Sequence, residues 1–567
     1  MPMSAESPSS ASHLNQAPVL VLGHGISGQA MARWCVRQGA QVTVADTRHQ
    51  PELMQRLAQE LQALAAPGQV PPQVVCAPLD AALLASQPWA CVCKSPGLSP
   101  AQLQPVTDWS LHRPAGSVLG ELDLFAQGLK HAYAGAGFQP KVLAITGTNG
   151  KTTTTSLTGL LLERVGWRVA VAGNIGPAML DVLLQAMDFE RKQAEMLAEK
   201  AQAATEKELV DSASSLPQAW VLELSSFQLD GVRTGPDGFE PTAATVLNIT
   251  EDHLDWHGSM AHYAAAKFRV FGQQGVRVLN REDAAVMAAR PEETLGQSAK
   301  ASRHRLAAAE SVVNQPPEWT SFGTDLPQRP GDWGLEVVNG MAWLVRAQPA
   351  DETQRQRKGQ PQPEPERVLQ RLMPAEALRI RGRHNAANAL AALALATAAG
   401  APLAPMLHGL REYRGERHRV ESVAVINEVE FFDDSKGTNV GATLAAICGL
   451  GADRRLVMIL GGDGKGQDFS PLADAVRTHV QAVVLIGRDA PQLRNVLAPT
   501  GVPLFDAVDL PAAVRLAAAQ AQPGEAVVLS PACASLDMFR NYGHRAQVFI
   551  DTVAELATEQ GLTGVGE

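Results

Sequence analysis

Residues 141–155 read KVLAITGTNGKTTTT: an apolar run, a short turn with two glycines, and a segment with helical spacing. This order predicts a buried strand, a phosphate loop and a helix. Glycines let successive backbone N–H groups turn toward phosphate oxygens, and the following helix offers the positive end of its dipole. Lys151 would reach the terminal phosphates, and the Thr152 hydroxyl would ligate Mg²⁺. The stretch therefore favours a nucleotide-binding α/β domain.

This loop is shorter than the common phosphate-loop pattern. The common pattern has a glycine five residues before the Gly-Lys pair, where this chain has Ile145. The alternative is a plain turn between a strand and a helix. The strand before the loop, the Lys-Thr pair after it and the polar motifs described below favour nucleotide binding.

Length and composition indicate several soluble globular units. The chain has 567 residues, which suggests three or more domains. Hydrophobic residues make up 45% and charged residues 19%, with a net charge of −10. Because counterion-release binding needs a basic face, we expect no nucleic-acid partner.

The termini and apolar stretches give no sign of membrane insertion. The first Lys or Arg is Arg33, and residues 1–16 are expected to be a disordered tail rather than a signal sequence. The most apolar stretch, residues 386–400, is shorter than the ~18 residues of a membrane span, so we expect a buried helix there.

Six cysteines occur without a Cys-x-x-Cys pair. Neither a disulfide framework nor a zinc site is indicated, and a reducing cytoplasm fits best.

A second glycine-rich turn lies near the N-terminus. An apolar run at 17–22 is followed by GHGISG at 23–28, a helical segment at 29–38, a strand at 41–45 and Asp46. This is the layout of a dinucleotide fingerprint, but the same loop would hold the pyrophosphate of another nucleotide, and a ligand-free turn is a third reading. Ser95, at the end of another strand, either faces the same crevice or belongs to an ordinary turn.

Polar residues follow several predicted strands of the middle region. Asn174 follows a strand at 168–172, where open parallel sheets place their ligands. Glu223 lies inside an apolar run, and a buried acid is costly unless it is paired or binds a metal. The cluster at 248–255 includes His253 and suits divalent-cation phosphoryl chemistry.

Two features of the helical segments are ambiguous on residue type alone. Lys267 lies in a helical segment at 262–271, where a lysine is expected on the surface. Asn385 and Asn388 share one face of the Ala-rich helix, and N-capping would account for only one of them.

The C-terminal part alternates strands and helices, with polar clusters after the strands at 433–439, 461–465 and 530–537. This predicts a second doubly wound sheet. Residues 189–215 are expected to form an exposed helical excursion and residues 348–367 a flexible loop, whereas residues 281–375 give no clear pattern overall.

Seven motifs together resemble the Mur ligases, and more narrowly the members that add D-glutamate: TGTNGKT (146–152), ELSSFQL (223–229), NITEDH (248–253), GRHN (382–385), DDSKGTN (433–439), GGDGK (461–465) and SPACASLD (530–537). The resemblance runs from Gly23 to about Phe549. It implies an α/β protein with three domains: a Rossmann-like UDP-sugar domain at 1–120, a central ATPase domain at 121–415 carrying insertions near 189–215 and 348–367, and a Rossmann-like amino-acid domain at 416–567.

The resemblance also implies an ATP-dependent ligase of cytoplasmic peptidoglycan precursor synthesis. Its substrates would be UDP-N-acetylmuramoyl-L-alanine and D-glutamate, and the protein would be a monomer with no membrane or nucleic-acid partner. The carboxylate of the first substrate would become an acyl phosphate, which the D-glutamate amine would attack. Electrostatic stabilisation of gathered anions should dominate such a reaction.

Site residues follow from the same resemblance. Lys151, His253, Lys267 and Lys436 would be catalytic. The nucleotide would contact Gly147, Thr148, Asn149, Gly150, Lys151, Thr152, Thr153, Asn385, Asn388, Arg419 and Asp434, with His418 nearby. Two Mg²⁺ ions would be held by Thr152, Glu223, His253 and a carbamylated Lys267. The UDP-sugar would contact Ile26, Ser27, Asp46, Thr47, Ser95, Asn174 and Ser225. D-Glutamate would contact Thr438, Lys465, Ser535, Leu536 and Tyr542, the last where the family pattern has Phe.

Three other functions stay open. A sister ligase would share the ATP chemistry but use another acceptor, although the Asp434-Ser435-Lys436 element argues against the diaminopimelate- or lysine-adding member. A nicotinamide-dependent oxidoreductase could use the Gly23 loop. An inactive scaffold would release no phosphate with any amino acid.

Overall fold

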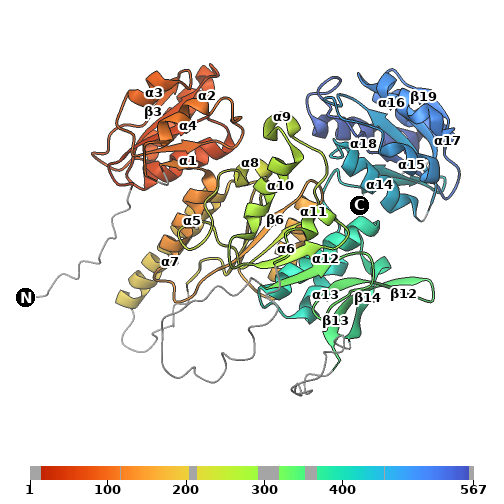
Figure 1. Ribbon diagram of the computed structural model, residues 1–567, viewed down its shortest axis with the longest axis horizontal. Coiled ribbons are helices and arrows are strands. Elements are labelled where there is room, and N and C mark those ends of the chain that lie inside the picture. The colour runs from red at the N-terminus through yellow and green to blue at the C-terminus, as the bar shows by residue number, and fades with distance from the viewer. Residues whose placement is uncertain are drawn as a thin grey trace, which may run out of the picture.

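The computed structural model describes residues 14–114, 117–203, 214–291, 318–350, 367–452 and 454–560. These residues form three sheets in chain order, with five, nine and six strands. Figure 1 shows the N-terminal domain in red and orange and the C-terminal domain in blue, placed above opposite sides of the central domain. The expected three-domain α/β architecture is confirmed.

The N-terminal sheet is parallel, with strand order β3-β2-β1-β4-β5. Its strands are β1 Pro18–Leu22, β2 Gln41–Asp46, β3 Gln73–Cys76, β4 Cys91–Lys94 and β5 Val118–Leu119. Its helices are α1 Ile26–Arg37, α2 Pro51–Leu64, α3 Ala81–Ala85 and α4 Gln104–Ser110. The strands β2 and β3 lie on one side of β1, and β4 and β5 lie on the other. The carboxyl ends of β1 and β4 therefore flank a topological switch point, where such sheets bind ligands.

The expected disordered tail over residues 1–16 is too long. Residues 14–16 form a turn on this domain, with Leu14 only 3% exposed and the Gln16 N–H donating to the Gly39 carbonyl at 3.0 Å. Burial of an apolar side chain holds this turn in place. Residues 1–13 lie outside the described residues.

The central sheet has the order β14-β13-β12-β11-β10-β9-β6-β8-β7. It is parallel from β12 to β7, and β13 and β14 extend it as antiparallel strands. The strands are β6 Lys141–Thr146, β7 Val169–Gly173, β8 Ala219–Glu223, β9 Ala243–Val246, β10 Val276–Asn280, β11 Trp319–Phe322, β12 Trp333–Val338, β13 Met341–Pro349 and β14 Arg367–Pro374. The last four lie in the region without a clear sequence pattern, and half of the residues of the outermost strand, β14, are exposed.

Helices cover this sheet, and α7 carries part of one predicted insertion. They are α5 Glu121–Ala132, α6 Lys151–Arg164, α7 Met179–Ala203, α8 Ser226–Leu229, α9 Leu254–His257, α10 Met260–Phe268, α11 Ala284–Met287, α12 Arg383–Ala398 and α13 Leu403–Glu412. The Ala-rich α12 is buried, as expected. Of the 189–215 excursion, residues 189–203 continue α7 and 204–213 lie outside the described residues; of the 348–367 loop, 351–366 lie outside them.

The C-terminal sheet has the order β15-β16-β20-β17-β18-β19 and is parallel apart from the β15–β16 pair. Its strands are β15 Glu421–Ile426, β16 Val429–Asp433, β17 Leu456–Gly461, β18 Val480–Ile486, β19 Leu504–Asp506 and β20 Ala526–Leu529. Its helices are α14 Val440–Gly451, α15 Leu472–His479, α16 Ala490–Leu497, α17 Leu510–Gln520 and α18 Tyr542–Glu559. The second doubly wound sheet is thus confirmed. No helix in the described ranges has both the length and the hydropathy needed to cross a bilayer.

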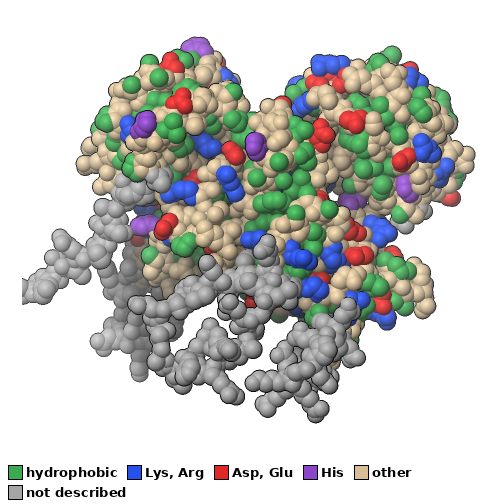
Figure 2. Space-filling view, viewed as in Figure 1, with side chains coloured by type: hydrophobic (Ala, Val, Ile, Leu, Met, Phe, Trp, Pro, Cys, Tyr) green, Lys and Arg blue, Asp and Glu red, His purple; other side chains and the backbone are tan. Residues whose placement is uncertain are grey.

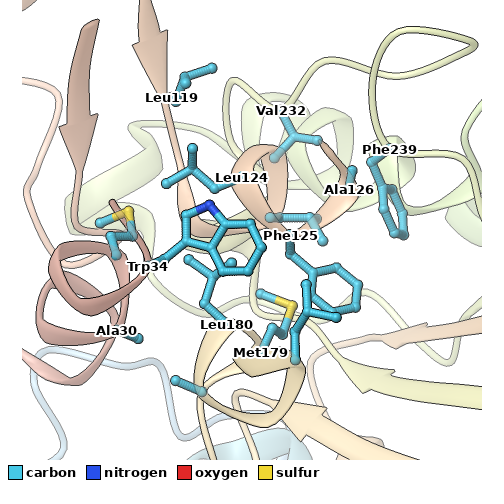
Figure 3. Close-up of a cluster of buried hydrophobic side chains, with 14 of the residues drawn as sticks. Ala30, Trp34, Leu119, Leu124, Phe125, Ala126, Met179, Leu180, Val232 and Phe239 are labelled. Carbon is cyan, nitrogen blue, oxygen red and sulfur yellow. The ribbon is translucent and has the colours of Figure 1, made fainter. Parts of the chain in front are cut away.

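The N-terminal and central domains share one hydrophobic core. Figure 3 shows Trp34 of α1 among Phe125 of α5 and Leu180 of α7, and all three side chains are buried. A Cβ on Gly128 would lie 2.6 Å from the Trp34 ring, so only glycine fits there. Because a shared core resists relative motion, the carboxyl edge of the first sheet is held in position against the central domain.

Candidate functional site

A cleft of about 900 Å³ lies between the central and C-terminal domains. Figure 2 shows the two outer domains separated by a notch above the central domain. The cleft brings together thirteen of the residues predicted from the sequence: Thr148, Asn149, Gly150, Lys151, Thr152, Asn174, Glu223, His253, Arg419, Lys436, Thr438, Lys465 and Tyr542. Its wall is polar and contains many charged side chains of both signs.

The phosphate loop has the geometry that its glycines predict. Gly150 has a φ of 81°, and a Cβ there would lie 2.6 Å from the Asn388 side-chain oxygen. The Thr148 and Asn149 N–H groups donate to the carbonyl and the side-chain oxygen of Asn248, at 2.9 and 2.8 Å. The residues after β9 therefore fix the loop, which leaves the first-turn N–H groups of α6 at the cleft.

Lys151 begins α6 and folds back over the loop. Its ammonium donates to the carbonyls of Gly147 and Thr148 at 2.9 and 2.8 Å. Burial lowers the pKa of Lys151, while the nearby Glu223 carboxylate opposes that shift. A cation held this way at a phosphate loop suits a polyphosphate ligand.

Glu223 ends β8 with its carboxylate buried at the cleft. One oxygen accepts a hydrogen bond from the Asn174 amide at 2.6 Å, and the other is buried without a partner among the described residues. A buried carboxylate oxygen without a partner is costly, and a divalent cation would satisfy it. The Thr152 hydroxyl and the His253 ring line the same cleft.

His253 has the properties of a neutral metal ligand. Its backbone is left-handed, with a φ of 55°, and its ring lies 4.7 Å from that of Phe227. Burial lowers the pKa of His253, although Asp252, 3.6 Å away, opposes the shift. A neutral imidazole keeps a lone pair for a metal.

Lys267 is buried, so the surface position expected from residue type alone is wrong. The side chain is 2% exposed, donates to the Gly147 carbonyl at 2.8 Å and lies over the Tyr263 ring at 4.6 Å. The physical reason is the docking of α10 beneath the phosphate loop. Burial and the neighbouring Lys151 hold the pKa of Lys267 well below its usual range, which favours the neutral amine that carbamylation requires.

Tyr263 was missed by the sequence reasoning. Its hydroxyl lies 3.1 Å from that of Thr148, which in turn accepts a hydrogen bond from the Thr250 N–H at 3.0 Å. The ring thus joins Lys267 to the phosphate loop. The only available signal was its position four residues before Lys267 on a helix.

The C-terminal domain contributes cations and a tyrosine to the cleft. The Lys436 ammonium lies 3.9 Å from the centre of the Tyr542 ring, and the His418 ring lies 6.4 Å from it. His418 Nδ1 is 2.7 Å from the Asp433 carboxylate. These contacts fix Lys436 and His418 on the side of the cleft that faces the phosphate loop.

Several predicted nucleotide residues lie behind the cleft wall. Asn385 and Asn388 are buried beneath the phosphate loop and bonded to each other at 3.1 Å. Asp434 is buried, accepts from the Ser530 hydroxyl at 2.6 Å, and has its pKa raised to about 7 by burial. Thr153 is buried in the first turn of α6. These side chains are placed to hold the loops that form the wall.

The predicted UDP-sugar residues do not line the cleft. Ile26, Ser27, Asp46, Thr47 and Ser95 gather at the carboxyl edge of the N-terminal sheet, after β1, β2 and β4. The structure therefore separates them from the cleft, apart from Asn174.

The Asp46 carboxylate has partners that the sequence reasoning did not name. It accepts from the His24 N–H at 2.9 Å and from the Arg48 guanidinium at 2.8 and 3.0 Å. Although burial opposes ionisation, these hydrogen bonds hold the pKa of Asp46 well below its usual range. A ligand at Asp46 would meet Arg48 as well.

Three predicted residues belong to loops beside these sites. Ser225 caps α8 and bonds to Gln228. Ser535 is buried in the loop after β20, and its neighbour Leu536 is 67% exposed. None of the three lines the cleft.

Three family models match the chain, in the same order as the three domains. They are the Mur ligase MurD-like N-terminal domain at residues 17–107, the Mur ligase middle domain at 145–320 and the Mur ligase glutamate ligase domain at 418–533.

Similar proteins cover nearly the whole chain. A UDP-N-acetylmuramoylalanine--D-glutamate ligase from Albidiferax ferrireducens is 55% identical over 98% of this chain and 99% of its own length. Ligases of the same name from Burkholderia pseudomallei (strain 668) and Polaromonas sp. are 53% and 47% identical; the matches cover 96% and 97% of this chain and 98% and 99% of theirs.

Solved structures share the fold at low identity. MurF from Acinetobacter baumannii is 18% identical with a TM-score of 0.51, over 96% of this chain and 92% of its own. MurF ligase from Thermotoga maritima in complex with ADP is 12% identical with a TM-score of 0.50, over 97% of this chain and 96% of its own.

Proposed function

The chain belongs to the Mur ligase family, and from that premise we propose that it joins D-glutamate to UDP-N-acetylmuramoyl-L-alanine while converting ATP to ADP and phosphate. One observation carries the proposal: a single cleft brings Lys151 and Glu223 of the central domain to face Lys436 and Lys465 of the C-terminal domain. The names of the relatives support the acceptor, since they match over nearly the full chain.

The proposed reaction has two steps. A carboxylate is a poor acylating agent, so the carboxylate of the muramoyl-alanine substrate first attacks the γ-phosphorus of ATP, and ADP leaves. The D-glutamate amine then attacks the carbonyl carbon of the acyl phosphate, and inorganic phosphate leaves from the tetrahedral intermediate. Both steps gather negative charge, which fixed cations and N–H groups stabilise.

The phosphate loop, residues Gly147 to Thr153, is proposed to hold the β- and γ-phosphates, with Lys151 as the nearest cation. Arg419 and Lys436 would meet the nucleotide from the C-terminal domain. Asn385, Asn388 and Asp434 would act from behind the wall, by holding the loops that touch it. In this arrangement Lys151 and Lys436 neutralise the charge that develops during phosphoryl transfer.

Mg²⁺ fits the donors present. The free oxygen of Glu223, the Thr152 hydroxyl and the His253 imidazole are ligand types that Mg²⁺ accepts, and a carbamate on Lys267 would add a further anion. When bound, the metal supplies charge neutralisation at the phosphates. Two ions are proposed, one near Thr152 and Glu223 and one near His253.

The substrates are proposed to occupy the two remaining regions. The UDP-sugar would lie along the N-terminal edge, at Ile26, Ser27, Asp46, Thr47 and Ser95, and would reach the cleft past Asn174 and Ser225. D-Glutamate would lie between Thr438, Lys465, Ser535, Leu536 and Tyr542. A lysine opposite a carboxylate favours an acidic amino acid over a neutral one.

An acceptor panel tests the proposal. Phosphate release from ATP and Mg²⁺ is measured with UDP-N-acetylmuramoyl-L-alanine and each of D-glutamate, L-glutamate, D-alanine, L-lysine and diaminopimelate. Release that requires D-glutamate supports the proposal. Release with another amino acid instead would assign a sister ligase, and a nicotinamide absorbance change without phosphate release would assign an oxidoreductase.

A further inference from the structure

Arg545 is a buried cation that none of the steps above uses. It lies one turn into α18, behind Tyr542, and is 1% exposed. Its hydrogen bonds among the described residues all go to backbone carbonyls: Cys533 at 3.1 and 3.2 Å and Ser435 at 2.9 Å. Burying a guanidinium without a direct carboxylate partner is costly, so this arrangement calls for a reason beyond packing.

The two carbonyls belong to the two loops proposed to hold the acceptor. Ser435 lies between Asp434 and Lys436 after β16, and Cys533 lies two residues before Ser535 after β20. These strands are neighbours, with Asp433 opposite Leu529. One planar guanidinium with five donors can hold both carbonyls at a fixed separation, which a single ammonium cannot do.

The peptide groups that contain these two carbonyls also form hydrogen bonds to other loops of the cleft, through the N–H groups of Lys436 and Ala534. The Lys436 N–H donates to the His418 carbonyl at 3.1 Å. The Ala534 N–H donates to the Asp463 carbonyl at 2.8 Å, and the Asp463 N–H returns a bond to Ala534 at 3.0 Å. Because a peptide group is planar, fixing its carbonyl also fixes the direction of its N–H. Arg545 therefore acts on four loops through two peptide groups.

The positive charge of Arg545 also favours an anionic ligand in front of these loops. Burial lowers the pKa of Arg545 to about 10, while Cys533, Asp537, Asp433 and Asp434 nearby oppose that shift, so the guanidinium stays charged at neutral pH. A buried cation behind the loops favours anions in front of them, because low-dielectric surroundings screen it weakly.

We infer that Arg545 is a positioning residue for the amino-acid acceptor: by holding the carbonyls of Ser435 and Cys533, it fixes the loops that place Thr438 and Ser535 beside D-glutamate. This inference rests on the proposed function and adds a residue that does not itself touch the substrate.

The test compares Arg545→Lys and Arg545→Met with Arg515→Met. Arg515 lies on α17 and bonds to Glu555 and Glu559 on the exposed side of α18, so it controls for loss of an arginine that contacts the same helix. The Michaelis constants for D-glutamate, ATP and UDP-N-acetylmuramoyl-L-alanine are measured for each variant. Thermal unfolding and ADP binding report folding independently of turnover.

The expected result is a selective change. Arg545→Lys, which can hold only one carbonyl well, should raise KM for D-glutamate about tenfold, and Arg545→Met should raise it further. KM for the other two substrates should stay within about twofold, as should all three constants of Arg515→Met. Replacing a merely structural arginine would lower the apparent kcat without raising KM for D-glutamate selectively, because it changes the folded fraction rather than one subsite.

The outcomes distinguish the role of Arg545 from the proposed ligase function. If Arg545→Met does not fold, Arg545→Lys decides. A D-glutamate KM within about twofold of the unmodified chain, or equal rises for all three substrates, would overturn the role of Arg545 and leave the proposed function standing. An unmodified chain that releases no phosphate in response to D-glutamate would overturn both.

Discussion

Arg419 donates a hydrogen bond from Nη2 to the Thr152 hydroxyl over 2.7 Å, although 267 residues separate them along the chain. A second bond, from the Asn439 amide to the Asn149 side chain at 3.4 Å, crosses the same boundary. The C-terminal domain is therefore joined directly to the phosphate loop, and the cleft is completed by both domains.

Replacing Arg419 should weaken nucleotide use. Arg419→Ala removes a charged donor at the phosphate loop, and a hydrogen bond to a charged group contributes roughly 1.5–3 kcal/mol. KM for ATP should rise roughly 10- to 100-fold, measured by steady-state phosphate release. Arg414→Ala, which removes an exposed arginine five residues before Arg419, is the control and should leave this KM unchanged. Equal values for the two variants would refute a nucleotide role for Arg419.

Lys151 should be essential for turnover. Lys151→Ala removes the cation nearest the proposed γ-phosphate and should lower kcat by at least about 10²–10³, the loss typical of a transition-state donor. Lys141→Ala removes an exposed lysine from the start of β6, the strand that leads into the phosphate loop, and should retain full activity. Near-normal phosphate release by Lys151→Ala would contradict the phosphate-loop assignment.

Lys267 should carry a carbamate. In carbon-13 bicarbonate, the unmodified chain should show a carbamate carbonyl resonance that Lys267→Ala lacks, independently of activity. Lys267→Ala should also lose most turnover and regain part of it with added acetate or formate, since a short carboxylate can replace the missing anion. Full turnover by Lys267→Ala without such additives would remove the carbamate from the account.

The histidine of the GRHN motif should make stability depend on pH. His384 is partly buried, with its Nδ1 enclosed against α14, where a Cβ on Gly449 would lie 2.3 Å from that atom, and this burial lowers the pKa of His384 to about 4. Its usual pKa is near 6.5, so between these values the unfolded chain binds the extra proton. The stabilising contribution is therefore complete above about pH 6.5 and is lost as the pH falls toward 4, by up to about 3 kcal/mol.

Thermal unfolding at pH 7 and pH 5 measures this dependence. His384→Asn should lose less stability than the unmodified chain between the two values, because asparagine does not titrate. His112→Asn, an exposed histidine of the N-terminal domain, should behave like the unmodified chain. An equal loss of thermal stability between pH 7 and pH 5 in all three proteins would contradict the lowered pKa of His384.

The elements that the sequence predicts well are those whose signal is local. The phosphate loop and the cluster with His253 follow apolar runs, and Glu223 lies inside one, so the pattern identifies both the strand and the polar side chains at its end. The composition of residues 386–400 likewise predicts a buried helix, which the structure places at 383–398.

Features that depend on contacts between distant segments could not be found this way. Lys267 is buried because α10 packs under the phosphate loop, a contact across 120 residues. Arg545 meets a carbonyl 110 residues earlier, and nothing in its own segment indicates that partner. Arg48, only two residues after Asp46, was detectable in principle, since an arginine so close to an acid often pairs with it.

Isotope transfer tests the central claim most directly. UDP-N-acetylmuramoyl-L-alanine labelled with oxygen-18 in its carboxylate is turned over with ATP, Mg²⁺ and D-glutamate, and the released phosphate is analysed by mass spectrometry. Attack of the carboxylate on ATP predicts one oxygen-18 atom in each phosphate, because the bridging oxygen of the acyl phosphate leaves with phosphorus. Phosphate released without the label would contradict the acyl-phosphate route.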